Sequence, residues 1–166
     1  MEISFAPSSE YAAHGRERTH QDGAGLSTLS GTDLRWYYFL GRLSITHSGI
    51  DIGPPWGWVP LFDAMYCVQQ VMVYAQGGDS LGRIDFTEND ESIGFELDQH
   101  GALRVTPSYL DTELWCPAAE FVASGADFIR RELRRVTTEY PDLAGNEHVQ
   151  ELARDVGGGS PEARGI

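Results

Sequence analysis

The segment from Trp58 to Gly78 is apolar on nearly every side of the helix that it predicts. Its Leu, Ala, Met and Val residues recur every three or four positions, and Phe, Tyr and Val side chains occupy much of the opposite side. A helix that is apolar nearly all round is buried in a core. Pro60 suits its first turn and Gly77 its exit. A helix of about 16 residues is shorter than the roughly 20 that cross a bilayer, so we expect the central helix of a soluble domain.

Composition limits the partners and the chemistry. The 166 residues are 41% hydrophobic, which is typical of one globular domain, and they carry a formal net charge of −13. This charge disfavours nucleic acid and membrane surfaces and favours a basic partner. All 12 basic residues are arginine. Without lysine, Schiff-base and phosphate-loop chemistry are excluded.

The two cysteines and the N-terminus indicate a compartment. Cys67 and Cys116 are flanked by apolar or aromatic residues and stand in no metal-type cluster. We interpret them as buried thiols in a reducing environment. The first residues contain no basic segment followed by an apolar run, so we expect a cytoplasmic protein.

The chain divides into three parts. Residues 1–33 lack an apolar period and are expected to be a flexible arm with a short strand over residues 2–5. Residues 34–156 are expected to be a single α+β domain, and residues 157–166 a disordered, Gly-rich tail. Within the domain, alternation predicts strands over 34–40, 42–47 and 50–52, followed by a rigid connector over 53–58.

The second half predicts an antiparallel meander and more helices. Apolar and polar residues alternate over 83–87, 92–97 and 103–109, which gives a sheet with one apolar and one wet face. An edge strand over 110–116 could pair two copies into a homodimer. A long amphipathic helix is predicted over 117–139, and Asn146 is expected to cap a third, short helix. The expected fold is therefore an α+β domain in which the meander packs against the central buried helix and the second long helix.

Negative charge concentrates in the meander. Residues 83–120 contain nine acids and two arginines, a net charge of −7. A solvated surface explains these acids, and so does a docking face for a basic protein, since charge complementarity speeds encounter. The residues assigned to that face are Asp85, Glu88, Asp90, Glu91, Glu96 and Asp98.

No catalytic, cofactor or metal motif was found, which favours a protein that is not an enzyme. Cys116 has Trp115 and Pro117 as neighbours and no base beside it in the sequence. The hairpin acids are expected to titrate normally, so they do not form an acid–base pair. We therefore expect no cofactor and no metal site.

The tryptophans leave a second interpretation open. Trp56 and Trp58 could close one end of the core, form an aromatic hot spot for a partner, or line an apolar ligand pocket. A small-molecule-binding protein or an enzyme of a biosynthetic cluster would use such a pocket, between sheet and helix. Its candidate lining is Trp36, Tyr38, His47, Trp56, Trp58 and Tyr66.

The order of these elements resembles a group of known proteins. The matching stretches are Val59–Ala75, Ile84–Leu97 with the pattern F-x-E-x-D-E-x-I-x-F, and Glu120–Leu152 with Tyr-Pro-Asp-Leu before an Asn-led helix. They resemble small, largely uncharacterised proteins of GC-rich bacteria, some of which are similar to immunity proteins of toxin systems. The resemblance implies an α+β domain and a dedicated protein partner, conceivably a toxin, and carries over no catalytic residue. Our leading interpretation is an immunity-type binding module whose acidic sheet face binds a basic protein.

Overall fold

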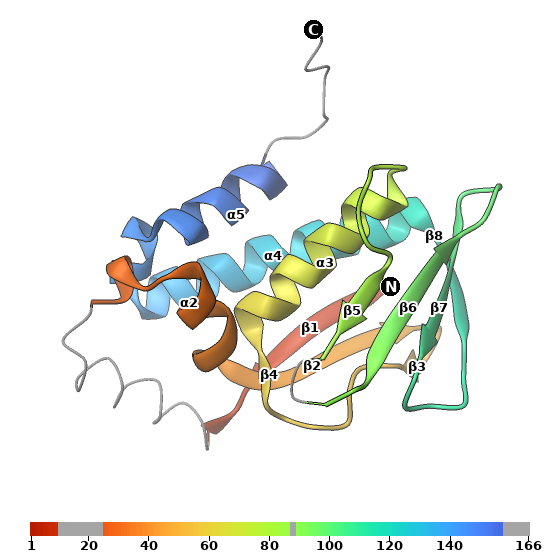
Figure 1. Cartoon of the computed structure of the whole chain (residues 1–166), viewed down its shortest axis with the longest axis horizontal. Coiled ribbons are helices and arrows are strands. Elements are labelled where there is room, and N and C mark those ends of the chain that lie inside the picture. Colours follow the sequence, from red (N-terminus) through yellow and green to blue (C-terminus); the bar gives the residue numbers. More distant parts are fainter. Residues whose placement is uncertain (10–24, 87–88, 158–166) are drawn as a thin grey trace, which may run out of the picture.

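The computed structural model describes residues 1–9, 25–86 and 89–157, and shows an α+β fold with helices packed against antiparallel sheets (Figure 1). This confirms the expected fold class. The strands form two four-stranded sheets. The first sheet contains β1 (Glu2–Pro7), β2 (Leu40–His47), β3 (Ile50–Asp51) and β4 (Val59–Pro60). The second contains β5 (Arg83–Asp85), β6 (Ser92–Leu97), β7 (Ala102–Pro107) and β8 (Leu114–Pro117), in that order.

The helix α3 (Leu61–Ala75) is the central element that the sequence predicts. Ten of its fifteen residues are buried. It packs against α4 (Ala118–Glu139), against α2 (Gly31–Tyr37) and against strands of both sheets. Its apolar circumference is thus explained, because α3 meets protein on almost every side. The helix α5 (Glu147–Gly157) packs on α4 (Figure 1).

The predicted meander is present as β5–β6–β7. The edge strand predicted over 110–116 is confirmed only from Leu114, where β8 begins, because residues 110–113 form a bend and a loop. Ile84, Ile93, Phe95, Leu103 and Val105 are all buried, so the alternate residues of these strands face the core. A strand places successive side chains on opposite faces, so the residues between them face outward. The two-residue period in the sequence is therefore sufficient to orient this sheet.

The strand predicted over residues 34–40 is wrong. Residues 31–37 form the helix α2, and only Leu40 of that stretch belongs to a strand. Ser30 caps α2 by accepting a hydrogen bond from the backbone N–H of Asp33 at 3.1 Å, and Leu34 is fully buried. The alternation of apolar residues resembled a strand, but the capping Ser-x-x-Asp motif and the packing of α2 on α3 favour a helix.

The expected strand at residues 2–5 is confirmed and reaches Pro7. It pairs along its whole length with β2, from Glu2 opposite Thr46 to Pro7 opposite Gly41. This part of the expected flexible arm therefore belongs to the sheet. The arm prediction is also wrong for residues 25–33, which contain η1 (Leu26–Thr28) and the capped start of α2. Residues 10–24 of the arm and 158–166 of the expected tail lie outside the described residues.

Two short 3₁₀ helices, η1 (Leu26–Thr28) and η2 (Pro141–Gly145), lie near the start of α5. Asn146 is fully buried and caps α5, as the sequence predicts, by accepting from the backbone N–H of His148 at 3.0 Å. Its amide also donates to the carbonyl oxygens of Leu26 and Leu29. One side chain thus starts a helix and fastens the segment before α2. Within the described ranges, none of the helices has the length and apolar character that crossing a membrane requires.

Candidate functional site

The connector between β3 and β4 is folded by the side chain of Asp51. Its carboxylate accepts hydrogen bonds from the hydroxyl of Ser44 at 2.8 Å and from the backbone N–H groups of Ile45 and Gly53 at 3.2 and 2.8 Å. Gly53 passes so close to β2 that an added Cβ would lie 2.8 Å from the Cα of Ser44. These contacts orient the following residues, 54–58, so that Trp56 packs beside the second sheet.

An aromatic cluster fills that space. The ring of Trp56 packs edge-on against Phe86 at 5.2 Å and against Tyr109 at 5.3 Å between ring centroids. The hydroxyl of Tyr109 donates to the carbonyl oxygen of Ile52 at 2.6 Å. The indole N–H of Trp56 is buried and has no hydrogen-bond partner among the described residues. Trp56 therefore joins the two sheets at one edge.

Trp58 lies on the outer side of this cluster. Its ring stacks on Trp56 with centroids 6.4 Å apart and planes inclined by 29°. Trp58 is nevertheless 42% exposed, in contrast to the buried Phe86. One side of its ring is thus supported by protein while much of the residue faces solvent.

Acidic residues surround this aromatic cluster along three chain segments, 51–58, 86–91 and 108–112, which we call the loop edge. Figure 1 shows the segments 51–58 and 108–112 along its lower side. The three segments contain Asp51, Asp90, Glu91 and Asp111, with Glu88 at a position outside the described residues, and no basic residue. The pKa of Tyr109 is raised mainly by burial and, to a smaller extent, by the negative charges of Asp51 and Glu91. The acids therefore place a negative field at the aromatic cluster.

Two acids of the loop edge have local partners. Glu91 accepts a hydrogen bond from the hydroxyl of Ser108, and Asp51 is engaged as described above. Asp90 and Asp111 are exposed. The register also places one base next to the loop edge, since Arg42 follows Gly41, which pairs with Val59.

Other acids predicted for the docking face lie on the outer side of β5–β8, which we call the strand face, and are paired with arginine. Asp85 forms an ion pair with Arg83. Arg104 lies between Glu96, at 3.4 Å, and Glu113, at 2.7 Å. The hydrogen bond from Arg104 holds the pKa of Glu113 below its usual value. The charges of this face are thus largely compensated locally.

Asp98 has a structural role at the opposite end of β6. Its carboxylate accepts from the backbone N–H groups of Ala102 and His100, each at 2.8 Å, and closes the turn between β6 and β7. The hydrogen bond from Ala102 is the main cause that lowers the pKa of Asp98. The six acids predicted for one face therefore divide among the loop edge, the strand face and a turn, and Glu88 is not described.

The six residues predicted to line a pocket do not converge on one cavity. Trp36 and Tyr66 lie around the guanidinium of Arg35, with ring centroids at 5.7 and 5.1 Å. His47 lies at the far end of β2, 3.4 Å from Glu120. Tyr38 is buried just before β2 begins, and His47 is the last residue of that strand. The eight residues of β2 therefore separate the two side chains by about 25 Å. Trp56 and Trp58 belong to the loop edge.

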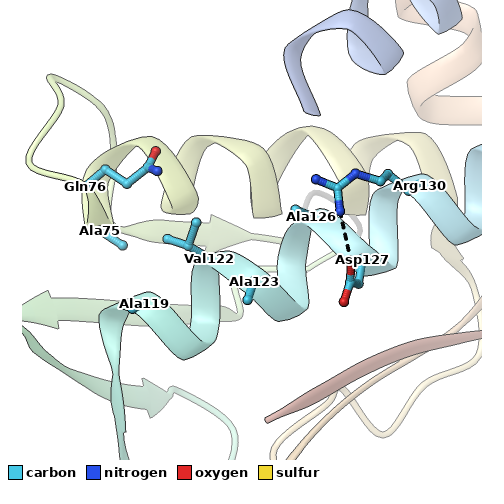
Figure 2. A pocket seen from close by; sticks show the side chains of 8 residues that line it. All are labelled: Ala75, Gln76, Ala119, Val122, Ala123, Ala126, Asp127 and Arg130. Atoms are coloured by element: carbon cyan, nitrogen blue, oxygen red, sulfur yellow. Dashed lines mark hydrogen bonds and ion pairs between the residues drawn. The ribbon is translucent and has the colours of Figure 1, made fainter. Parts of the chain in front are cut away.

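A groove that the sequence does not predict lies between α3 and α4 (Figure 2). Its volume is about 510 Å³, and its lining is Ala75, Gln76, Ala119, Val122, Ala123, Ala126, Asp127 and Arg130. Figure 2 shows the ion pair of Arg130 with Asp127, and Arg130 also donates to the carbonyl of Val156. The recurring alanines of α4 were its only sequence signal. These two charged groups are already paired, so the groove offers mainly small apolar surface.

The described residues contain no group of three or more His, Cys, Asp or Glu side chains that could hold a metal ion. Both cysteines are buried, and burial raises the pKa of Cys116 to about 11 and that of Cys67 to about 12. Such thiols are protonated at neutral pH and are poor nucleophiles.

Comparisons with family models, curated proteins and solved structures gave no match to this chain.

Proposed function

We propose that this protein is a non-enzymatic binding module that captures a basic protein, of the toxin-immunity type, through its loop edge. The observation that carries the proposal is the distribution of arginine. The segments of the loop edge contain four described acids and no base, with Arg42 as the one base that the register places beside them, whereas the acids of the strand face have Arg83 and Arg104 as ion-pair partners. An acid without a nearby base keeps its field for an incoming partner.

Two further features support a binding function. Trp58 is an exposed aromatic residue at the end of the acidic segment 51–58 and stacks on Trp56, and exposed aromatic residues are typical anchors of binding hot spots. Burial raises the pKa of both thiols, so they are protonated at neutral pH and are poor nucleophiles. The proposal therefore needs only recognition by charge and shape.

The test compares two double charge reversals that change the net charge equally. Asp90→Arg/Asp111→Arg alters the loop edge, and Asp85→Arg/Glu96→Arg alters the strand face. The probe is a capped, fluorescently labelled nine-lysine peptide, whose binding is followed by anisotropy at several salt concentrations. We expect the loop-edge variant to lose affinity on the order of tenfold and to show a weaker salt dependence.

The strand-face variant is expected to lose less than threefold, since those acids are already compensated. Equal losses in the two variants would contradict the assignment to the loop edge. A wild-type protein that shows no salt-dependent binding of the peptide would contradict the proposed function itself.

A further inference from the structure

We propose that the exposed ring of Trp58 is a recognition platform for an arginine side chain of the basic partner. The proposal rests on the proposed function, which concerns charge alone, and adds a preference for arginine over lysine. The structural basis is the layered order of the loop edge, with Trp58 outside, Trp56 beneath it, and Phe86 and Tyr109 behind Trp56.

The platform is held in place before any partner arrives. Trp58 stacks on Trp56, and Trp56 is fixed by two edge-on ring contacts. Tyr109 is in turn fastened to the connector by its hydrogen bond to the carbonyl of Ile52. A ring supported from behind loses little conformational freedom on binding, so a contact with it retains most of its free energy.

The chemistry of the ring selects the ligand. A guanidinium is planar and weakly hydrated and stacks on an indole face, whereas the compact ammonium of lysine holds its water more strongly. The exposed acids Asp90 and Asp111 lie on two segments that flank the aromatic cluster, and carboxylates bind guanidinium groups with paired hydrogen bonds. An exposed indole ring with carboxylates on neighbouring segments therefore offers a guanidinium a stacking face and hydrogen-bond acceptors, and Arg42 on β2 is the base of this chain that lies next to it in the register.

The chain contains a matched control for this assignment. Trp115 on β8 is 49% exposed, slightly more than Trp58. Its register neighbour is Arg104, and its indole N–H donates to Glu113 at 3.3 Å. Trp115 thus lies on the strand face, beside acids that already have an arginine. A second arginine has no uncompensated carboxylate to join there.

The experiment measures the affinities of capped nine-arginine and nine-lysine peptides for wild type, Trp58→Ala, Trp58→Phe and Trp115→Ala. We expect the wild type to prefer the arginine peptide by roughly three- to tenfold. Trp58→Ala should abolish this preference while its affinity for the lysine peptide changes less than twofold. Trp58→Phe keeps a ring and should retain part of the preference, and Trp115→Ala should retain all of it.

Thermal unfolding of each variant verifies that the fold is intact, and Trp58→Phe tests the platform even if Trp58→Ala does not fold. A preference that survives in Trp58→Ala, or one that Trp115→Ala removes equally, overturns the platform and leaves the charge-based function standing. Absence of binding of both peptides to the wild type overturns both proposals.

Discussion

The loop edge and the strand face are both acidic in sequence, yet they differ in what their charges meet. On the strand face, cross-strand register places Arg104 opposite Glu96, and the same arginine also reaches Glu113. The three segments of the loop edge contain acids and no base of their own, and Arg42 is the base that the register places beside them. The comparison teaches that the charge available to a partner depends on which acids the fold places beside arginine.

The largest expected effect is on stability, and it tests inside the core what happens when an acid loses its arginine, at the pair of Arg35 and Asp63. Asp63 is 6% exposed, and Arg35 donates to its carboxylate from Nε at 2.9 Å and from a second guanidinium nitrogen. Arg35→Ala leaves a buried carboxylate without its cation, so we expect the free energy of unfolding at neutral pH to fall by about 2–4 kcal/mol. Chemical denaturation measures the loss.

The pH dependence of that variant has a definite sign. Burial raises the pKa of Asp63 even in the intact pair, and Arg35 opposes this rise. Without Arg35 the pKa rises further, and an acid with a raised folded pKa destabilises the protein as pH increases through that value. The deficit of Arg35→Ala should therefore shrink between pH 7 and pH 5. A deficit that stays constant would contradict an uncompensated carboxylate as its cause.

An intermediate effect is expected when the strand face loses its central base. Arg104→Gln frees Glu96 and Glu113, so this face should acquire a field like that of the loop edge. Affinity for the nine-lysine peptide should rise roughly threefold. The pKa of Glu113, measured by NMR, should rise towards its ordinary value because its main lowering cause is removed.

Arg134→Gln is the matched control, since it removes the same charge from an exposed position on α4. It should change the peptide affinity much less than Arg104→Gln does. Equal gains from the two substitutions would show that net charge, and not local compensation, distinguishes the two regions.

The smallest effect concerns Asp98, which serves a turn and no partner. Its pKa is lowered by backbone N–H groups, so its stabilising contribution is present above the unfolded pKa of about 3.8 and is lost as pH falls through the folded value. Asp98→Asn should flatten part of the acid-side loss of stability. It should leave binding of both peptides within a factor of two. A clear loss of peptide binding in Asp98→Asn would show that Asp98 belongs to the docking surface after all.

The periodicity of the sequence correctly predicted the elements that bury a continuous apolar set. The helix α3, the meander and α4 follow from spacings of 3.6 and 2 residues, because those spacings decide which side chains share a face. The sequence also predicts the cap at Asn146, since its role depends on residues two and three positions ahead. These features are local, so the sequence contains their full cause.

Residues 34–40 show where local reasoning is insufficient. Leu34, Trp36 and Tyr38 alternate as in a strand, but Leu34 is buried in a helix. Arg35 donates a hydrogen bond to Asp63, 28 positions away. The Ser30 cap was a sequence signal for this helix, and its outcome still depended on the packing of α2 against α3. The secondary structure of a short segment therefore depends on the surface against which it packs.

By itself, the sequence determined the fold class, the central helix and the concentration of acids, because composition and period are properties of neighbours along the chain. Only the tertiary structure decided that β1 pairs with β2, that the strands divide into two sheets, and which acids lie beside an arginine. Those outcomes depend on pairing and turns between distant segments. The free energy of such contacts is set by geometry that no single stretch of sequence encodes.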